Sequence, residues 1–323
     1  GDVYKRQAAF RFIEARKKAY VFSAALILAG IAAMVVNIAA VGAWQNYGVD
    51  FTGGSLVQLR FEGEVTAGDI RSALGGAQAP PITRFGEDHE FVIRAPIAED
   101  ASIEEVAGGI EAQVRAAMPN EAFTVVRTEL VGAKVGNELQ QKAALAILFS
   151  FVTTLIYLAF RFELRFGAAA VIATMHDILV TLGFLALFRV EISLTTVAAL
   201  LTIVGYSLND TIVVFDRIRE NMGKKGARKR DPVDLVNQSI NETLPRTVLT
   251  SGTTLAVLFS LLILGGPVIR DFTLVLILGV IIGTYSSIFV ASPALLEIQK
   301  RWGTGDAKEK ERSKRQRVAG KDR

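Results

Sequence analysis

The sequence contains no cysteine and only two histidines, His89 and His176. Without cysteine the chain can form neither a disulfide bond nor a thiolate metal site, and its redox compartment cannot be read from the sequence. Two histidines alone do not make a zinc site, and the HExxH pattern of zinc proteases is missing. We therefore expect no metal centre.

Charged residues are also scarce for a soluble protein. They make up 21% of the 323 residues, whereas hydrophobic residues make up 51%. A soluble domain is rarely so apolar, and a pure membrane bundle is rarely so charged. Together the two fractions predict a membrane protein that carries a soluble insert.

Six apolar runs are long enough to cross a bilayer as helices. They cover residues 20–43, 143–160, 166–188, 194–215, 247–264 and 272–295. Residues 1–19 precede the first run, and residues 296–323 form a basic tail. A polar, basic loop at 216–246 separates the fourth run from the fifth, and a segment of mixed polarity at 44–142 separates the first from the second.

The 44–142 segment has the pattern of a small globular domain. Its alternating residues, caps and turn residues predict strand, helix, strand, strand, helix and strand at 49–61, 66–74, 82–85, 90–94, 102–118 and 123–130. This β-α-β-β-α-β order is that of a ferredoxin-like α+β domain. Nothing in the domain looks catalytic, and His89 beside a predicted turn is more typical of a surface residue than of a ligand.

The basic residues predict the orientation. Of the 36 lysines and arginines, 26 lie before the first run, in the turn at 161–165, in the 216–246 loop and in the tail. All four segments lie on one side of a six-span topology, and basic residues favour the cytoplasmic side. We therefore expect both termini in the cytoplasm and the domain outside. The positive charge then reflects topology and attraction to anionic lipid, and nucleic acid is not expected as a partner.

The fourth run continues into the most informative motif of the chain, GYSLNDTIVVFDRIREN at 205–221. Asp210 lies in this motif about 10 Å inside Arg217 by helical rise, which places it within the membrane. An ionised carboxylate costs about 3 kcal/mol there, so an acid at such a depth predicts a function, of which proton transport is the most direct. The alternative is a structural hydrogen bond to a neighbouring helix.

Polar residues of two other runs reach a similar depth. His176 and Asp177 lie about 15 Å inside the third run, and the hydroxyls of the fifth run lie about 6–12 Å inside. We expect burial to favour the protonated form of Asp210. Its candidate neighbours in a proton pathway are His176, Asp177, Ser207, Asn209, Thr250, Ser251, Thr253 and Thr254. The hydroxyls of the fifth run fit helix packing equally well.

The sixth run carries a GxxxG pattern at Gly279 and Gly283. Two glycines at this spacing let another helix approach closely, within the bundle or from a partner protein. The pattern is weak by itself, and packing within the bundle is the simpler interpretation.

Four motifs together resemble the SecF family of bacterial preprotein translocase subunits. They are GVDFTGGS at 48–55, VGNEL at 135–139, the pair His176 and Asp177, and the motif around Asp210. The resemblance extends from about Tyr20 to Leu295, and six spans with one external domain after the first is also the layout of this family.

The resemblance implies partners and a mechanism. SecF pairs with SecD, and the pair is similar to a half-sized proton-driven transporter of the RND type. It works with the SecYEG channel and the SecA ATPase on an unfolded preprotein at the bacterial cytoplasmic membrane. By this resemblance Asp210 belongs to the proton pathway, no cofactor is expected, and the protein is not an enzyme.

Two alternatives stay open. An RND-like, proton-driven exporter of small molecules or lipids would share the acid in the membrane, although a domain of about 97 residues is small for a drug pocket. A purely structural scaffold of the translocon would tolerate neutral replacement of every acid in the membrane. An enzyme acting inside the membrane is disfavoured, because no nucleophile and base stand at a workable spacing.

Overall fold

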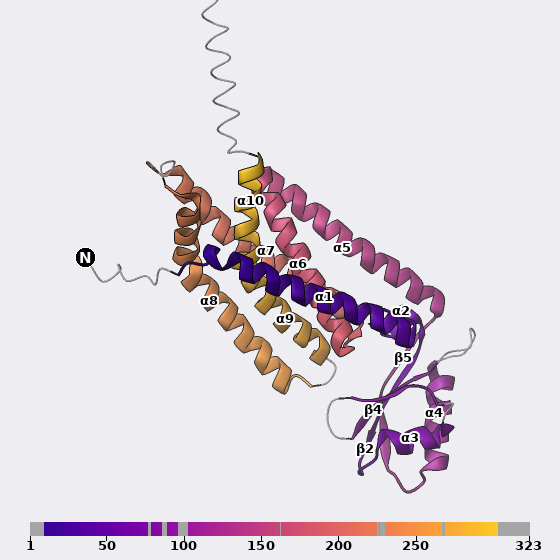
Figure 1. The fold of residues 1–323 in the computed structure, drawn as a ribbon. Coiled ribbons are helices and arrows are strands. Elements are labelled where there is room, and N and C mark those ends of the chain that lie inside the picture. Colours follow the sequence, from indigo (N-terminus) through magenta and orange to yellow (C-terminus); the bar gives the residue numbers. More distant parts are fainter. Residues whose placement is uncertain are drawn as a thin grey trace, which may run out of the picture.

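A computed structural model describes residues 10–76, 79–85, 89–95, 103–161, 163–224, 226, 230–266 and 269–302. Within these residues, six helical segments are long and apolar enough to cross a membrane, which confirms the predicted number. They form a bundle, and a small α+β domain lies at one end of it (Figure 1). The chain is therefore a multi-pass helical membrane protein.

The bundle is built from seven α-helices and two short helical turns. The first span consists of η2 (Ile13–Ala15) and α1 (Arg16–Val41), and the next four are α5 (Ala133–Arg161), α6 (Leu164–Phe188), α7 (Leu194–Gly223) and α8 (Pro232–Leu264). The last span consists of α9 (Arg270–Ser286), the π-helical turn η6 (Ser287–Ala291) and α10 (Ser292–Trp302).

Three spans form the centre of the bundle. In the most apolar stretch of α6, of α7 and of the last span, 56%, 50% and 61% of the residues are buried. The corresponding values for α1, α5 and α8 are 6%, 6% and 17%, so these helices present apolar side chains outward. Because an apolar exterior suits lipid or a partner helix, the polar groups on α6, α7 and α9 lie in the most protected part of the molecule.

Glycines set the closest approaches between these helices. Gly30 of α1 and Gly183 of α6 face each other so closely that a Cβ on Gly30 would lie 2.5 Å from the Cα of Gly183. On α9, Gly279 lies against Ile203 and Gly283 against Ser207, both of α7. The two glycines of the GxxxG pattern therefore contact a helix within this bundle.

The small domain contains a four-stranded antiparallel sheet in the order β3-β4-β2-β5. Its elements are β2 (Gly54–Phe61), α3 (Ala67–Ala73), β3 (Ile82–Arg84), β4 (Glu90–Ala95), α4 (Ile103–Ala117) and β5 (Phe123–Val131). Leu59, Ile70, Phe91 and Val114 belong to one core shared by the sheet and both helices. The order of strands and helices is the predicted one, although residue 102, where the second helix was predicted to begin, lies outside the described residues.

Two glycines shorten the first predicted strand. Val49–Thr52 forms a helical turn, α2, and the strand begins only at Gly54. Gly53 and Gly54 have φ angles of 69° and 127°, which side chains with a Cβ rarely adopt. The prediction of a strand from residue 49 was wrong, because alternation of side chains does not reveal this change of backbone direction.

A two-stranded parallel ribbon was not predicted. β1 (Asn46–Tyr47), after the first span, pairs with β6 (Glu191–Ile192), between the third and fourth spans. Strands of two residues carry no periodic pattern, so only the tertiary structure reveals them. The ribbon therefore connects the segment just before the small domain with the segment just before α7.

Several helices extend beyond the apolar runs. α5 begins at Ala133 rather than at 143. In these additional first turns, Glu138 and Lys142 form an ion pair one turn apart. α7 ends at Gly223 and α8 begins at Pro232, so most of the predicted 216–246 loop is helical. Helical hydrogen bonding continues through polar residues of good helix propensity, whereas hydropathy reports only the apolar part. The last span likewise continues past 295 to Trp302, and residues 303–323 of the predicted basic tail lie outside the described residues.

Polar contacts join the C-terminal end of α7 to the N-terminal half of α8. Arg217 of α7 donates to the carboxylate of Glu242 on α8 at 2.5 Å. Asn221 donates to the same carboxylate and to Ser239, each at 2.9 Å. Asp231 caps α8 by accepting from the backbone N–H of Val233. These contacts explain why a segment that reads as a polar loop folds as the continuation of two membrane helices.

Candidate functional site

Two carboxylic acids are buried in the centre of the bundle, Asp177 on α6 and Asp210 on α7. Their exposed fractions are 0% and 2%. Leaving a charge in such a place without hydrogen bonds is costly, so the partners of each acid decide what it can do. Each acid has partners of its own.

Three side chains lie within hydrogen-bonding distance of the carboxyl group of Asp177. Oδ2 accepts from the hydroxyls of Ser207 on α7 and Ser286 on α9, the latter at 2.8 Å. Oδ1 lies 2.9 Å from Nδ1 of the neighbouring His176. Thr181, one turn later on α6, donates to the carbonyl oxygen of Asp177 at 2.7 Å. Three helices therefore converge on this one carboxylate.

The polar contacts continue from His176 toward α1. Nε2 of His176 lies 3.0 Å from the hydroxyl of Ser23. That hydroxyl lies 3.2 Å from the hydroxyl of Tyr285 on α9, which donates to the carbonyl oxygen of Ala19 at 3.0 Å. A continuous series of hydrogen-bonding groups thus joins the centre of α6 to the first half of α1.

Asp210 has a separate set of neighbours. Its Oδ2 accepts from Ser251 of α8 at a long 3.4 Å, and the same hydroxyl lies 2.7 Å from Thr284 of α9. Arg246, near the middle of α8, interacts electrostatically with the carboxylate. Thr284 also interacts with the carboxylate of Asp210. Asp210 is therefore buried between two hydroxyls and one arginine, a setting that suits a group that gains and loses a proton.

The predicted neighbours of Asp210 do not all converge on it. Ser207 belongs to the Asp177 cluster, whereas Asn209 is exposed on the opposite face of α7. Thr250 and Thr253 donate to carbonyl oxygens of their own helix, and Thr254 accepts from Tyr206 at 3.4 Å and donates to the carbonyl of Thr250. Of the four hydroxyls predicted on the fifth span, only Ser251 reaches Asp210. The prediction used only depth along the helices, and a depth does not specify a face.

Three residues of these clusters were missed by the sequence analysis. Ser286, Thr284 and Tyr285 lie on α9, in a run interpreted only through its glycines. A signal was present, because TYSS at 284–287 is a polar cluster within an apolar run. Ser23 was visible as a rare polar residue of the first run, but nothing in the sequence linked it to His176.

Chemically, the site can hold and pass protons. It contains two acids, one imidazole and several hydroxyls, all of which accept or donate hydrogen bonds within the bundle. Within the described residues, no three histidine, aspartate or glutamate side chains are grouped closely enough to bind a metal ion.

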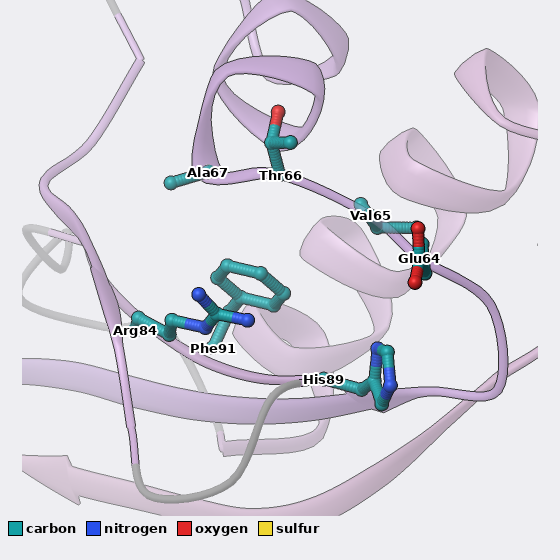
Figure 2. A pocket seen from close by; sticks show the side chains of 7 residues that line it. All are labelled: Glu64, Val65, Thr66, Ala67, Arg84, His89 and Phe91. Atoms are coloured by element: carbon teal, nitrogen blue, oxygen red, sulfur yellow. The ribbon is translucent and has the colours of Figure 1, made fainter.

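The small domain has a cleft of its own, of about 540 Å³. The half-buried His89 lies on its wall, and the ring of Phe91 points toward the segment that carries Thr66 and Ala67 (Figure 2). Glu64, Val65 and Arg84 complete the lining. The cleft is open and combines apolar side chains with both signs of charge.

Comparison with known proteins gives consistent results. Residues 110–301 match the family described as protein export membrane protein SecD/SecF, C-terminal, and residues 46–65 match the SecD/SecF GG motif. The chain is 48% identical over 287 residues to the protein translocase subunit SecF of Gemmatimonas aurantiaca, and this alignment covers 87% of this chain and 85% of the relative. It is 42% identical to the same subunit of Vibrio alginolyticus, with 92% of each chain covered.

A solved structure agrees with these matches. The crystal structure of SecDF, a translocon-associated membrane protein from Thermus thermophilus, superposes with a TM-score of 0.76 at 38% sequence identity. The superposition covers 90% of this chain but only 39% of the solved chain, so this chain spans about two fifths of that larger protein. With similarity of this extent in sequence and in structure, the chain belongs to the SecF family of protein translocase subunits.

Proposed function

We propose that this protein is an accessory subunit of the bacterial Sec export machinery that, together with SecD, uses the proton gradient to promote preprotein translocation. The observation that carries the proposal is Asp210, a buried acid within a membrane-spanning helix whose polar surroundings are the hydroxyls of Ser251 and Thr284 and the guanidinium of Arg246. A carboxylate this poorly solvated changes its interactions strongly when it binds or releases a proton. Moving one proton down a potential of 100 mV provides about 2.3 kcal/mol for such a change.

The arrangement of α7 supports SecD as the partner. One face of this helix exposes Ala198, Thr202, Gly205 and Asn209, which recur every three or four residues. Small and polar side chains of this kind suit close contact with another membrane helix better than contact with lipid. Asn209 belongs to this face, next to Asp210, so a partner helix there would lie beside the proton site.

The orientation follows from the same proposal. Both termini and the connection between α7 and α8 face the cytoplasm of a bacterial inner membrane, where basic residues favour contact with anionic lipid. The small domain is then a ferredoxin-like extracytoplasmic domain. In this position it can engage an unfolded preprotein that emerges from the SecYEG channel after SecA has pushed it through.

The mechanism requires no bond-making chemistry from this chain. Protonation removes the charge of Asp210, so the polar groups around the carboxyl group no longer stabilise a buried charge. The helices around Asp210 then favour a different packing, and the small domain moves with the end of the bundle to which it is tied. We propose that the protein acts as a non-enzymatic subunit without a cofactor.

The test is preprotein translocation into sealed vesicles that contain this protein and SecD, with and without a proton gradient. We expect Asp210→Asn to assemble normally and to lose the stimulation by the gradient, because an amide cannot bind a proton at this site. Asp231→Asn is the matched control, since it makes the same change at an exposed position where asparagine caps a helix as well as aspartate.

Equal stimulation of the wild type and Asp210→Asn would contradict the role of Asp210. Gradient-driven transport of a dye or lipid by the same vesicles, without an effect on preprotein, would instead support an exporter of small molecules.

A further inference from the structure

The contacts of His176 and Asp177 form a cluster distinct from that of Asp210. Ser207 and Asp210 are separated by less than one turn of α7, but Ser207 donates to Asp177, whereas Asp210 accepts from Ser251. Among the described residues, no hydrogen bond joins the two acids. The gradient-driven function proposed above uses Asp210, and it leaves the role of the second cluster open.

The donors and acceptors of this cluster can be satisfied completely in a state without an additional proton. Both hydroxyls that contact Asp177 Oδ2 donate to it, so the acid is an acceptor. The imidazole then carries its hydrogen on Nδ1 and donates it to Oδ1. Nε2 accepts from Ser23, while Tyr285 donates to the carbonyl of Ala19.

The same atoms can also be satisfied when the pair holds one additional proton. The proton shared by Nδ1 and Oδ1 can rest on either atom, but in both cases Nε2 now carries a hydrogen. Nε2 donates to Ser23, whose hydroxyl turns to donate to the oxygen of Tyr285, 3.2 Å away. Tyr285 keeps its bond to Ala19. A single rotation, that of the Ser23 hydroxyl, therefore converts one complete network into the other.

We propose that His176 and Asp177 take up one proton as a unit, and that Ser23 and Tyr285 are positioning residues that stabilise the protonated pair. Ser23 reverses its direction of donation, and Tyr285 supplies the acceptor that this reversal needs. Because Ser23 belongs to α1 and Tyr285 to α9, the protonation state of the pair changes contacts on three helices. The use of this proton in export rests on the proposed function, but its uptake does not.

The electrostatic surroundings of His176 are simple. Among the described residues, the titratable groups in contact with it are Asp177 and Tyr285. α7 brings Ser207 to the cluster, and η6 contributes no titratable side chain.

Charged side chains on the neighbouring helices have partners elsewhere. Arg16 of α1 lies 3.8 Å from Glu297 of α10. On α5, which packs against the outer side of α6, Glu138 pairs with Lys142 and Arg161 with Asp216 of α7. The groups in direct contact with the pair are therefore those of the cluster itself.

The direct test is nitrogen NMR of the imidazole in the full-length protein. The chain contains only two histidines, so His89→Gln leaves His176 as the sole imidazole. We expect Nε2 to change from a lone-pair nitrogen to a hydrogen-bearing nitrogen as the pH is lowered across the range in which the protein stays folded. An Nε2 that keeps one form throughout this range would overturn the proposal.

Variants of the two positioning residues distinguish proton binding from packing. Ser23→Ala removes a hydrogen bond to Nε2 in both states. The bond made by the protonated pair is the stronger one, so the ratio of protonated to unprotonated pair at a fixed pH should fall about tenfold. Tyr285→Phe removes the oxygen to which the turned Ser23 hydroxyl would donate but keeps Ser23 itself, so a smaller, several-fold fall is expected. Ser260→Ala and Tyr157→Phe make the same changes at exposed positions and should leave the ratio unchanged. A ratio in Ser23→Ala and Tyr285→Phe equal to that in these controls would overturn the positioning roles.

Translocation in the vesicles described above separates this inference from the proposed function. If Asp210→Asn loses stimulation by the gradient but Nε2 never changes form, the function stands and the second proton site is wrong. If Nε2 changes form but Asp210→Asn is still stimulated, the proton site stands and the role of Asp210 is wrong.

Discussion

Hydroxyl groups in this bundle have two different roles, and only hydroxyls that face the core can donate to an acid on another helix. Ser207, Ser251 and Ser286 are buried and donate to a carboxylate on another helix. Thr250 and Thr253 donate to carbonyls of their own helix instead. A hydroxyl that faces outward satisfies itself locally, whereas one that faces the core can polarise an acid.

The small domain contains a single-residue contact that is simple to test. Thr66 accepts from the backbone N–H of Asp69 at the start of α3, and Asp69 accepts from the side chain and the backbone of Thr66. These bonds hold the pKa of Asp69 below its ordinary value. A carboxylate with a lowered pKa stabilises the fold above its ordinary pKa, and this contribution is lost as the pH falls through the lowered value.

We predict that Thr66→Ala destabilises α3 by about 1 kcal/mol, because the helix loses its N-cap. Hydrogen exchange at neutral pH should show about fivefold faster exchange of the α3 amides, with α4 unchanged. Thr66→Ser keeps the hydroxyl and should exchange as the wild type does; equal exchange in Thr66→Ala would show that the cap contributes nothing.

Packing between helices depends on positions where no side chain is present. α1 is almost entirely exposed, yet Gly30 places its backbone against Gly183 of α6. The same contact keeps Ser23, two turns earlier on α1, within reach of His176. The approach of these two helices thus determines whether the second cluster forms.

We predict that Gly30→Ala destabilises the folded protein by about 1–3 kcal/mol, because the added methyl group would meet the backbone of Gly183. Thermal unfolding in detergent measures this as a lower Tm. Gly252→Ala on α8, where nothing lies within 4 Å of the added carbon, should be neutral or slightly stabilising. Equal Tm values for the two variants would refute the contact between α1 and α6.

Across the whole molecule, the small domain is tied to the helix that carries Asp210. Gly48 donates to Ile192 beside the β1–β6 pair, and Asp50 accepts from the N–H of Leu194 at the start of α7. Arg94 of β4 forms an ion pair with Glu191 of β6. Burial lowers the pKa of Arg94, and Asp271 at the start of α9 partly offsets this effect. A shift of α7 therefore reaches the domain through several short contacts.

We predict that Glu191→Ala loosens the domain by removing the partner of a largely buried arginine, at a cost of about 2 kcal/mol. Because the chain has no cysteine, Ser72→Cys and Ser260→Cys provide two unique sites for spin labels, one on the domain and one on α8. The distance distribution should broaden in Glu191→Ala. It should not broaden in Glu111→Ala, which breaks an exposed pair within α4, and an unchanged distribution in both would show that the ion pair does not hold the domain.

The amino-acid sequence was sufficient to predict the class of the protein, the six spans and the order of elements in the small domain. These features follow from hydropathy and from short-range periodicity, which are properties of consecutive residues. It also identified both buried acids, because a charge within an apolar run is visible without a structure.

Which polar groups meet depends on how the helices pack against one another. Ser207 donates a hydrogen bond to Asp177 although it is close to Asp210 in sequence, and Asn209 faces away from the core. Ser23 and Tyr285 meet His176 from opposite ends of the chain. The rotation and crossing of each helix depend on packing contacts between residues far apart in sequence, and depth along a helix contains no information about these angles.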